Sequence, residues 1–381
     1  MKEEKQLVTE LLEKAGIKIN NPLAKPWDIT VNNERFYQKA LNGSLGLGES
    51  YMDGDWDCDH LDEFGYRIFA SDLDTKIKKD PMTMARIALA RLRNFQSRSL
   101  ARKNGEAHYD IGNELFFSML DERKVYTCAY WDNAETLDEA QEEKLKMVCR
   151  KLNLRPGMRI LDIGCGWGSF LKYAVERYNV IGTGITISKN QAEYARKSCQ
   201  GLNVTIELKD YRDITGTYDA IVSLGMFEHV GPKNYRTYME LVARSLKDDD
   251  SIFLLHTIGG NATITMPDPW ITKYIFPGSH IPSIQQIGAA TEGLFVMEGC
   301  HNFGAYYDRT LMAWHENFDK RWQYLKNNQY DERFYRMWSY YLLMCAGNFR
   351  ARKCQLWQFP LTKKGMYGVY PVKGYGVLEY C

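Results

Sequence analysis

The sequence predicts an α/β protein in which a smaller, mainly helical N-terminal domain precedes a doubly wound, mainly parallel sheet. Short apolar runs alternate with amphipathic helical segments between residues 159 and 257, and this alternation is typical of a parallel sheet with helices on both faces. A turn with three glycines, residues 164–168, directly follows the first apolar run. The chain of 381 residues is also too long for one ordinary core, so we expect two domains.

The first domain is expected over residues 1–103. Its start is helical, because Leu7, Val8, Leu11 and Leu12 repeat at helical spacing and Gly16 is suited to end that helix. The alternating acids Asp53, Asp55, Asp57 and Asp59 lack the glycine that a calcium loop requires, since His60 takes that place, so we interpret them as a solvated polar face.

Residues 82–103 combine an apolar helical face with six cations, and no acid occurs between Pro81 and Gly105. A basic amphipathic helix of this kind can lie on an anionic lipid surface. It can equally pack its apolar face into a core and leave its basic face in water. Composition favours neither reading.

The second domain is expected over residues 104–381. A charged amphipathic helix over 136–152 leads into the first buried strand, and Ser188 is a natural N-cap for the helix after the second. The expected strands are 159–163, 180–187, 204–208, 218–223 and 251–257, and the expected helices between them are 170–177, 188–199 and 234–245.

The glycine turn has the spacing G-x-G-x-G, with Asp162 just ahead of it. An acid at this position would repel a pyrophosphate but suits a cationic or amine-bearing ligand, and a strand–turn–helix unit lets a ligand approach the backbone. The turn resembles the first motif of the class I S-adenosylmethionine-dependent methyltransferases.

Two further segments, 226–231 and 255–259, carry Glu228 and His256 at the expected ends of strands. Either residue by itself is more often a satisfied structural residue than a catalyst. The presence of both residues at the carboxyl edge of one sheet, beside a ligand-binding turn, favours a functional role for them. The sequence shows neither a Ser-His-Asp order nor a cluster with metal-ligand spacing, so we expect no metal.

Several longer strings are similar to those of the cyclopropane fatty acid synthases, relatives of the mycolic acid cyclopropane synthases. They are residues 45–54, 126–131, 160–168, 225–235, 254–259 and 274–278. The resemblance covers nearly the whole chain and implies a class I methyltransferase-like, Rossmann-like fold. Because the mycolic acid enzymes lack the 45–54 string, the full-length phospholipid synthases are the nearest type.

The resemblance implies an enzyme that transfers the methylene carbon from the S-adenosylmethionine methyl group to a cis double bond of unsaturated phospholipid chains. The products are a cyclopropane ring and S-adenosylhomocysteine. The alternative is a methyltransferase that adds a methyl group to another lipid or small molecule without ring closure. A binding protein that retains S-adenosylmethionine without turnover is a third reading.

The resemblance also implies the residues that bind each ligand. The expected S-adenosylmethionine contacts are Tyr126, Thr127, Asp162, Gly164, Cys165, Gly166, Gly168, Thr186, Ser188, Gln191, Asp210 and Tyr211. No acid follows the second strand, so Gln191 is the candidate for the ribose. A bicarbonate ion in the active site is expected to contact Cys128, Glu228, His256, the backbone of Ile258 and Tyr307. If the match to the family is shifted by one residue, Tyr306 takes the place of Tyr307. The sequence leaves open whether bicarbonate, Glu228 or His256 is the base.

Composition bounds the remaining properties. The 49 basic and 48 acidic residues give a net charge of +1, which argues against a general nucleic-acid binder. No run of about 18 apolar residues or signal-peptide core occurs, and the nine cysteines form no C-x-x-C pair. We therefore expect a cytoplasmic protein. From the basic segment 82–103 we expect it to associate peripherally with the inner face of the membrane, and the resemblance implies a homodimer. Residues 365–381 receive no role.

Overall fold

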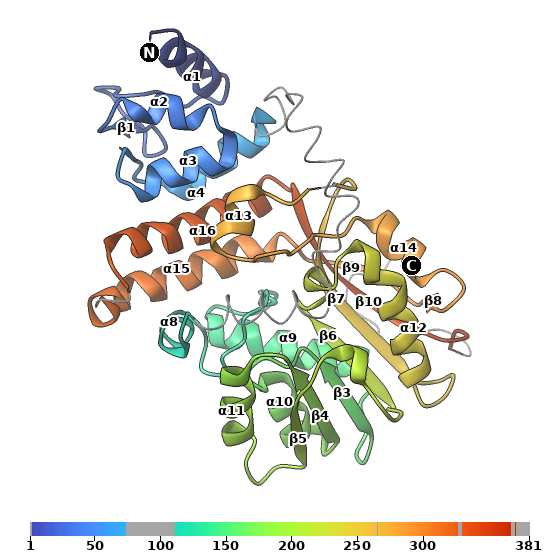
Figure 1. Ribbon diagram of the computed structural model, residues 1–381. Coiled ribbons are helices and arrows are strands. Elements are labelled where there is room, and N and C mark those ends of the chain that lie inside the picture. The colour runs from blue at the N-terminus through green and yellow to red at the C-terminus, as the bar shows by residue number, and fades with distance from the viewer. Residues whose placement is uncertain (1, 74–110, 265, 327–329, 367–369, 371–381) are drawn as a thin grey trace. The chain divides into compact units, whose positions relative to one another are not determined.

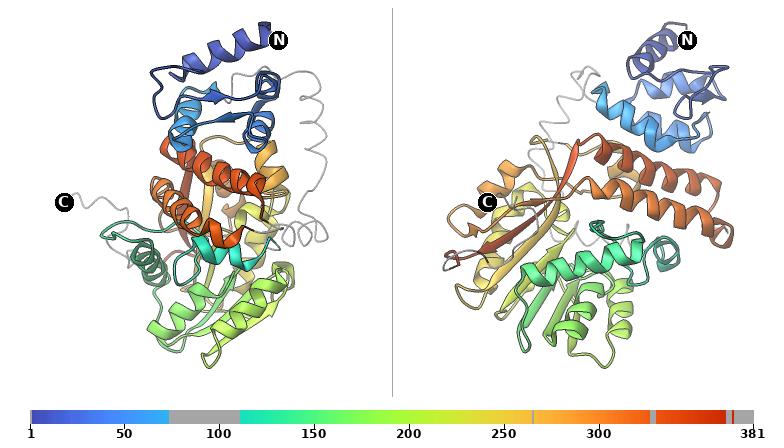
Figure 2. Two further views of the ribbon diagram at one scale, coloured as in Figure 1. Left: turned by 90° about the vertical axis from the view of Figure 1, so that its left-hand side faces the viewer. Right: turned by 180° about the vertical axis from the view of Figure 1, so that it is seen from behind.

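The computed structural model describes residues 2–73, 111–264, 266–326, 330–366 and 370 (Figures 1 and 2). The chain forms two compact units. The first comprises Met1–Arg93, Thr265–Pro277 and Tyr307–Cys354, and the second comprises Asn94–Ile264, Gly278–Tyr306 and Gln355–Cys381. The sequence predicts one uninterrupted second domain from residue 104, whereas 265–277 and 307–354 pack with the N-terminal helices. The expected boundary and the basic segment 82–103 lie outside the described residues.

The first unit is mainly helical, as predicted. Its helix α1 begins at Lys2 and ends at Lys14, and Gly16 follows with a positive φ of 68°. Helices α4 and α16 cross so closely that a Cβ on Gly347 would lie 2.5 Å from the carbonyl oxygen of Asp62. The other elements are β1 (Thr30–Val31), α2 (Arg35–Ala40), α3 (Gly43–Met52), β2 (Trp56–Asp57), α4 (Leu61–Ala70), α13 (Pro269–Tyr274), α15 (Tyr306–Leu325) and α16 (Glu332–Arg350).

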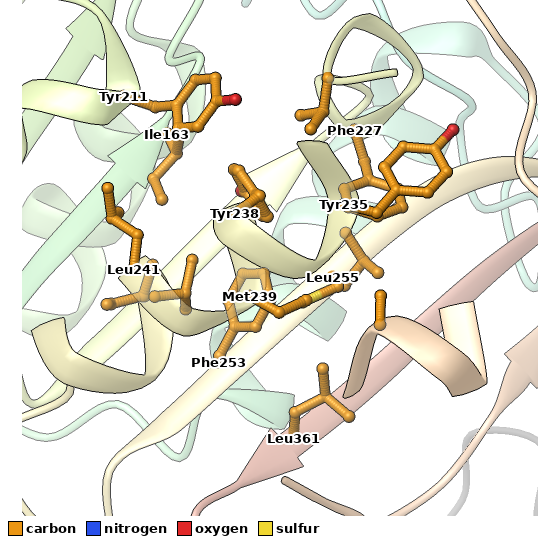
Figure 3. Close-up of a cluster of buried hydrophobic side chains, with 14 of the residues drawn as sticks. Ile163, Tyr211, Phe227, Tyr235, Tyr238, Met239, Leu241, Phe253, Leu255 and Leu361 are labelled. Carbon is orange, nitrogen blue, oxygen red and sulfur yellow. The ribbon is translucent and has the colours of Figure 1, made fainter. Parts of the chain in front are cut away.

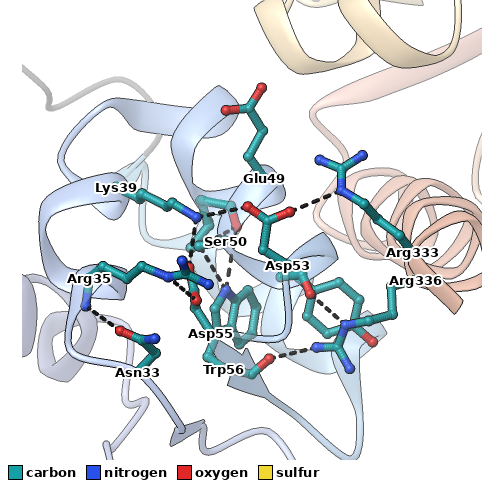
Figure 4. Close-up of polar contacts among 12 residues, drawn as sticks. Asn33, Arg35, Lys39, Glu49, Ser50, Asp53, Asp55, Trp56, Arg333 and Arg336 are labelled. Carbon is teal, nitrogen blue, oxygen red and sulfur yellow. Dashed lines mark hydrogen bonds and ion pairs between the residues drawn. The ribbon is translucent and has the colours of Figure 1, made fainter.

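An ion-pair network joins the 53–57 segment to α2 and α16 (Figure 4). Asp55 is buried and accepts hydrogen bonds from Arg35 Nε at 2.7 Å and Lys39 Nζ at 2.8 Å. Asp53 bonds Lys39 and Arg333 at 2.8 and 2.9 Å. The prediction of a solvated face is therefore wrong for Asp55, because cations from outside the segment compensate its buried charge.

The second unit contains a sheet with the strand order β5-β4-β3-β6-β7-β10-β8 in the described part of the chain, and β9 also pairs with β10. Strands β3, β4, β5, β6 and β7 run parallel to one another, whereas β8 and β9 run antiparallel to β10. The strands are β3 (Arg159–Ile163), β4 (Ile181–Thr186), β5 (Val204–Leu208), β6 (Ala220–Leu224), β7 (Ile252–Gly260), β8 (Val296–Met297), β9 (His301–Asn302) and β10 (Cys354–Thr362).

The strands and helices predicted between residues 136 and 257 are confirmed to within three residues. Ser188 caps its helix as expected, because its hydroxyl accepts a hydrogen bond from the backbone N–H of Gln191. The helices that the structure describes in this unit are α8 (Asn113–Met119), α9 (Leu137–Lys151), α10 (Ser169–Tyr178), α11 (Lys189–Ser198), α12 (Tyr235–Ser245) and α14 (Ile284–Thr291). Short 3₁₀ turns occupy Tyr211–Asp213, Phe227–His229 and Pro232–Asn234.

Helices cover both faces of this sheet. On one face, α12 and α14 bury aromatic and aliphatic side chains such as Tyr238 and Phe253 (Figure 3). On the other face, α9, α10 and α11 pack residues such as Leu145, Phe170 and Ala195 against the same strands. The sheet is therefore the doubly wound structure that the alternating pattern predicts.

The strand order reverses between β3 and β6. From β3 the chain proceeds outward through β4 and β5, then returns to β6 on the other side of β3 and continues to β7. Ligands of open α/β sheets bind beyond the carboxyl ends of the strands at such a switch point. Near the end of β3, Asp162 is paired in register with Val222 of β6. The glycine turn directly follows β3, so it begins at the switch point.

Candidate active site

The glycine turn adopts a conformation that side chains would disfavour. Gly164, Gly166 and Gly168 have φ values of 85°, 54° and 85°, in the left-handed region that glycine populates without strain. The backbone N–H groups of Gly164 and Cys165 both bond to the carbonyl of Ile185 at the end of β4, at 2.9 and 3.0 Å. A Cβ on Gly166 would meet no atom of the described residues within 4 Å, so a ligand can approach the backbone there.

Asp162 lies beneath this turn and is 2% exposed. Burial raises the pKa of its carboxyl to about 7, and the positive charge of Lys144 opposes that rise. Its Oδ1 atom has no hydrogen-bond partner among the described residues. An unpaired buried carboxylate oxygen is costly, and an amine-bearing ligand at the turn would relieve that cost.

Helix α9 fixes the irregular segment 125–131 that crosses beside the turn. Its buried Gln141 donates to the carbonyl oxygen of Thr127 at 2.8 Å, and its fully buried Lys144 donates to the Thr127 hydroxyl at 2.8 Å. Burial lowers the pKa of Lys144 to about 8, while the nearby groups of Asp121, Cys128 and Asp162 favour its charged form. One buried cation thus faces both predicted cofactor residues, Thr127 and Asp162.

The end of β4 supplies the next predicted group. The Thr186 hydroxyl lies 3.0 Å from Gln191 Oε1 and accepts a hydrogen bond from the backbone N–H of Ser188. All three residues are buried. Because Gln191 Oε1 accepts from Thr186, its amide nitrogen remains to donate to a ribose hydroxyl.

At the end of β5, the predicted residues Asp210 and Tyr211 lie in different surroundings. The Asp210 carboxylate caps a 3₁₀ turn and pairs with Arg212 Nη1 at 2.9 Å. Tyr211 is buried beside Tyr238, with ring centroids 5.2 Å apart, and its hydroxyl has no partner among the described residues.

Glu228 lies in the 3₁₀ turn that follows β6 and is 6% exposed. Its Oε1 atom accepts a hydrogen bond of 2.6 Å from the backbone N–H of Ile258 in β7. Its Oε2 atom is buried and has no partner within the described part of the chain. Burial raises the pKa of this carboxyl to about 7. The sequence predicts that the backbone of Ile258 contacts an anion, and its N–H is engaged by Glu228.

His256 is two residues before Ile258 in β7, a span of about 7 Å along an extended strand. The sequence predicts it near the end of a strand that stops at 257, but β7 continues to Gly260, and His256 is level with Leu224, the last residue of β6. Its ring contacts Phe303 at 5.7 Å between centroids, and Gln358 Nε2 lies 3.1 Å from its Nδ1. Burial, together with the charges of Lys144 and Lys151, holds the pKa of His256 well below its usual value.

Cys128 is fully buried, and its side chain is near enough to Lys144 to act on it electrostatically. The same lysine acts electrostatically on His256. Lys144 is therefore hydrogen-bonded to Thr127 and interacts electrostatically with Cys128, Asp162 and His256. Close by in the chain, Tyr130 makes edge contacts with His301, Phe303 and Tyr306 at 5.3–5.6 Å between ring centroids, which gives the second unit an aromatic cluster.

Tyr307, the remaining predicted anion ligand, belongs to the first unit. It lies in the first turn of α15 and stacks on Phe349, with ring centroids 4.5 Å apart. The neighbouring Tyr306 belongs to the second unit. The structure thus brings Cys128, Glu228, His256 and Ile258 into one unit and leaves the choice between Tyr306 and Tyr307 a prediction.

Sequence reasoning missed Gln141, Lys144, Lys151 and Gln358. Gln141, Lys144 and Lys151 lie on one face of α9, because they are three and seven residues apart, and Val148 lies on the same face. A polar stripe on the face that a helix turns toward a sheet was the available signal. Gln358 gave no such signal, because a buried amide in an antiparallel strand resembles any other strand residue.

In the ranges that the structure describes, no three His, Cys, Asp or Glu side chains are grouped as a metal site. None of the helices in those ranges is both long and apolar enough to span a bilayer.

The fold defines a class I S-adenosylmethionine-dependent methyltransferase. The solved structure of coclaurine N-methyltransferase, bound to N-methylheliamine and S-adenosylhomocysteine, matches with a TM-score of 0.69 at 22% identity. It covers 83% of this chain and 99% of the matched chain, and it bears on the fold. The cyclopropane synthase MmaA2 from Mycobacterium tuberculosis matches with a TM-score of 0.64 at 31% identity, over 69% of this chain and 98% of its own.

The chain belongs to the mycolic acid cyclopropane synthetase family, whose sequence model matches residues 96–359. It is 53% identical over 359 residues to the cyclopropane-fatty-acyl-phospholipid synthase of Escherichia coli K12, covering 94% of this chain and 93% of that protein. It is also 34% identical to cyclopropane mycolic acid synthase 3 of M. tuberculosis, over 68% of this chain and 96% of that protein. The chain is therefore an S-adenosylmethionine-dependent enzyme.

Proposed function

We propose that this enzyme forms cyclopropane rings in unsaturated phospholipid chains. The methyl carbon of S-adenosylmethionine bonds to one carbon of a cis double bond, and S-adenosylhomocysteine leaves. The other carbon of the former double bond carries the resulting positive charge. Loss of a proton from the transferred methyl group closes the ring and discharges the cation.

The observation that carries this proposal is the state of Glu228. One of its oxygens is fixed by the Ile258 N–H at 2.6 Å, and the other is buried without a partner among the described residues. An amine or hydroxyl acceptor also loses a proton, but from nitrogen or oxygen, which can pass it to water as well as to a side chain. Ring closure does need an acceptor for a carbon-bound proton, inside a site that keeps water from trapping the cation.

The residues fit the bicarbonate ion that the family resemblance implies. The imidazole of His256 and the thiol of Cys128 can donate hydrogen bonds to an oxyanion, and the unpaired Glu228 Oε2 can accept the ion's hydroxyl proton. Bicarbonate, when bound, would supply the base. Lys144 adds positive charge, and its electrostatic effect on both Cys128 and His256 supports an anion there.

The aromatic cluster suits a cationic intermediate. Tyr130 and Phe303 present ring faces and edges around His256 and His301. Aromatic faces attract a positive charge, more strongly when it is desolvated. Their apolar surface also favours an alkyl chain over a small polar acceptor.

Membrane association is proposed from the sequence of residues 82–103, which lie outside the described ranges. The cations of this segment would bind the anionic inner surface of the membrane, where the phospholipid substrate is found. A homodimeric, cytoplasmic enzyme held peripherally at that surface remains part of this proposal.

The test is incubation with unsaturated phospholipid vesicles and S-adenosylmethionine carrying a ¹³C-labelled methyl group. Ring protons bonded to the label in the NMR spectrum of the extracted lipid are the expected result. A labelled methyl branch without ring protons would support the alternative methyltransferase, and no S-adenosylhomocysteine release would support a binding protein.

A further inference from the structure

A chain of buried polar side chains leads from α9 to His256. Lys151, the last residue of α9, is 3% exposed, and Gln358 in β10 is fully buried. Lys151 Nζ lies 2.8 Å from Gln358 Oε1 and 2.8 Å from His301 Nδ1. Gln358 Nε2 lies 3.1 Å from His256 Nδ1. All four residues belong to the second unit.

The chemistry of Lys151 fixes the direction of each hydrogen bond in this series. A lysine ammonium group has donors and no acceptor, so below pH 7, where Lys151 is mainly charged, the side-chain oxygen of Gln358 must face it. The amide nitrogen of Gln358 then faces His256, and because an amide nitrogen only donates, His256 Nδ1 must accept. A neutral imidazole carries one proton, which is therefore on Nε2.

The second contact of Lys151 supports this assignment. Burial and the charge of Lys151 lower the pKa of His301 to about 3, so its ring is neutral and its Nδ1 can accept from the ammonium. Two acceptors thus face Lys151, and both favour its charged form. Burial lowers the pKa of Lys151 to about 7.

We infer that Lys151 and Gln358 are positioning residues that hold His256 as the Nε2–H tautomer. His256 then donates a hydrogen bond to a bound oxyanion and has no lone pair on Nε2 with which to take a proton from the substrate. The inference rests on the proposed function. It deepens that proposal, because it removes His256 from the candidate bases and leaves Glu228 or the bound anion.

The arrangement is expensive for a purely structural contact. A buried lysine, glutamine and histidine cost free energy that apolar side chains of similar volume would not cost. An equivalent relationship in the serine proteases shows the size of a tautomer effect, since a wrong histidine tautomer there lowers kcat by about 10⁴.

The decisive variant is Gln358→Glu, which keeps the shape of the side chain. One carboxylate oxygen still accepts from Lys151, but the other now accepts from His256, so the proton moves to Nδ1. The ¹⁵N spectrum of histidine-labelled full-length protein reads the tautomer directly, and the His256 signals are those lost in His256→Gln. We expect the proton on Nε2 in the parent and on Nδ1 in Gln358→Glu, with kcat lower by about 10²–10⁴ and KM for S-adenosylmethionine unchanged.

The matched control is Gln355→Glu on the same strand. Gln355 is also buried, but its amide contacts Asn261 and Asn302, both at 3.1 Å. This variant should keep the parental kcat and His256 spectrum. If Gln358→Glu does not fold, Lys151→Met tests the same point, because loss of the ammonium lets the Gln358 amide rotate and both His256 tautomers should appear.

A parent spectrum with the proton on Nδ1 overturns the inference. So does a Gln358→Glu enzyme with a reversed tautomer and the parental kcat. These outcomes are distinct from failure of the proposed function, because the tautomer is measured without turnover, whereas the function fails if the parent makes no cyclopropane lipid.

Discussion

The Nζ atom of Lys144 lies 2.8 Å from the hydroxyl oxygen of Thr127, so a fully buried cation fixes a residue of the proposed cofactor site. Lys144→Met should weaken S-adenosylmethionine binding by about 10- to 100-fold, because a hydrogen bond from a charged group contributes about 1.5–3 kcal/mol. Calorimetric titration measures this change. Lys146→Met is the control, since Lys146 pairs with Glu143 away from the site. Equal affinities for Lys144→Met and the parent would remove Lys144 from the cofactor site.

Gly166→Val should abolish measurable S-adenosylmethionine binding. The branched side chain would occupy the open space over the turn and would strain a backbone with a φ of 54°. Gly216→Val separates these two effects, because Gly216 is exposed, has a φ of 83° and also has no neighbour within 4 Å in the described residues. The control should lose stability but keep its affinity. A folded Gly166→Val protein with the parental affinity would contradict the cofactor assignment.

Glu228→Gln should lower turnover by about 10²–10⁴, the usual contribution of a positioned acid–base group, without changing cofactor affinity. Because proton loss follows methyl transfer, an impaired site should divert the cation toward methyl-branched or hydroxylated chains. S-adenosylhomocysteine release and lipid products are measured together, with Cys128→Ser as a second variant. Cyclopropane formation at the parental rate in Glu228→Gln would exclude the anion site.

Glu228 also links stability to pH. Burial raises its pKa from 4.5 to about 7, so the native state keeps its full stability below pH 4.5 and loses part of it as the pH rises through 7. The loss is at most about 3 kcal/mol, at 1.36 kcal/mol per pKa unit. The glutamine in Glu228→Gln does not ionise, so this variant does not lose stability in this way. The unfolding free energy of the variant minus that of the parent should therefore increase between pH 5 and pH 8. Urea unfolding measures the difference, and the exposed Glu240→Gln should show no such trend.

Membrane binding by residues 82–103 is tested by replacing Arg86, Arg91 and Arg93 with Gln. Each cation near an anionic surface contributes about 1 kcal/mol, so the triple variant should sediment less with anionic vesicles, and the difference should shrink at high salt. Equal sedimentation at low salt would instead favour a helix that packs into the protein.

The sequence was sufficient for the parallel part of the sheet because short, mainly apolar runs alternate there with turns and amphipathic helices. Strands such as Val296–Met297 and His301–Asn302 are too short to produce a pattern. Helix α16 was missed because aromatic residues occupy much of its length. Glu228 and His256 were proposed from their strings, whereas Gln358 contacts His256 from a position 102 residues away in the chain.

The division of the first unit into three chain segments constrains how the protein can be made and dissected. Its C-terminal helix α16 crosses α4 at Gly347, so the first unit cannot be completed during synthesis until residue 350 has left the ribosome. A fragment that begins at residue 104 would retain α16 without α3 and α4, the N-terminal helices that it packs against. Such a fragment should aggregate, and a viable minimal enzyme would require deletion or replacement of α15 and α16 as well.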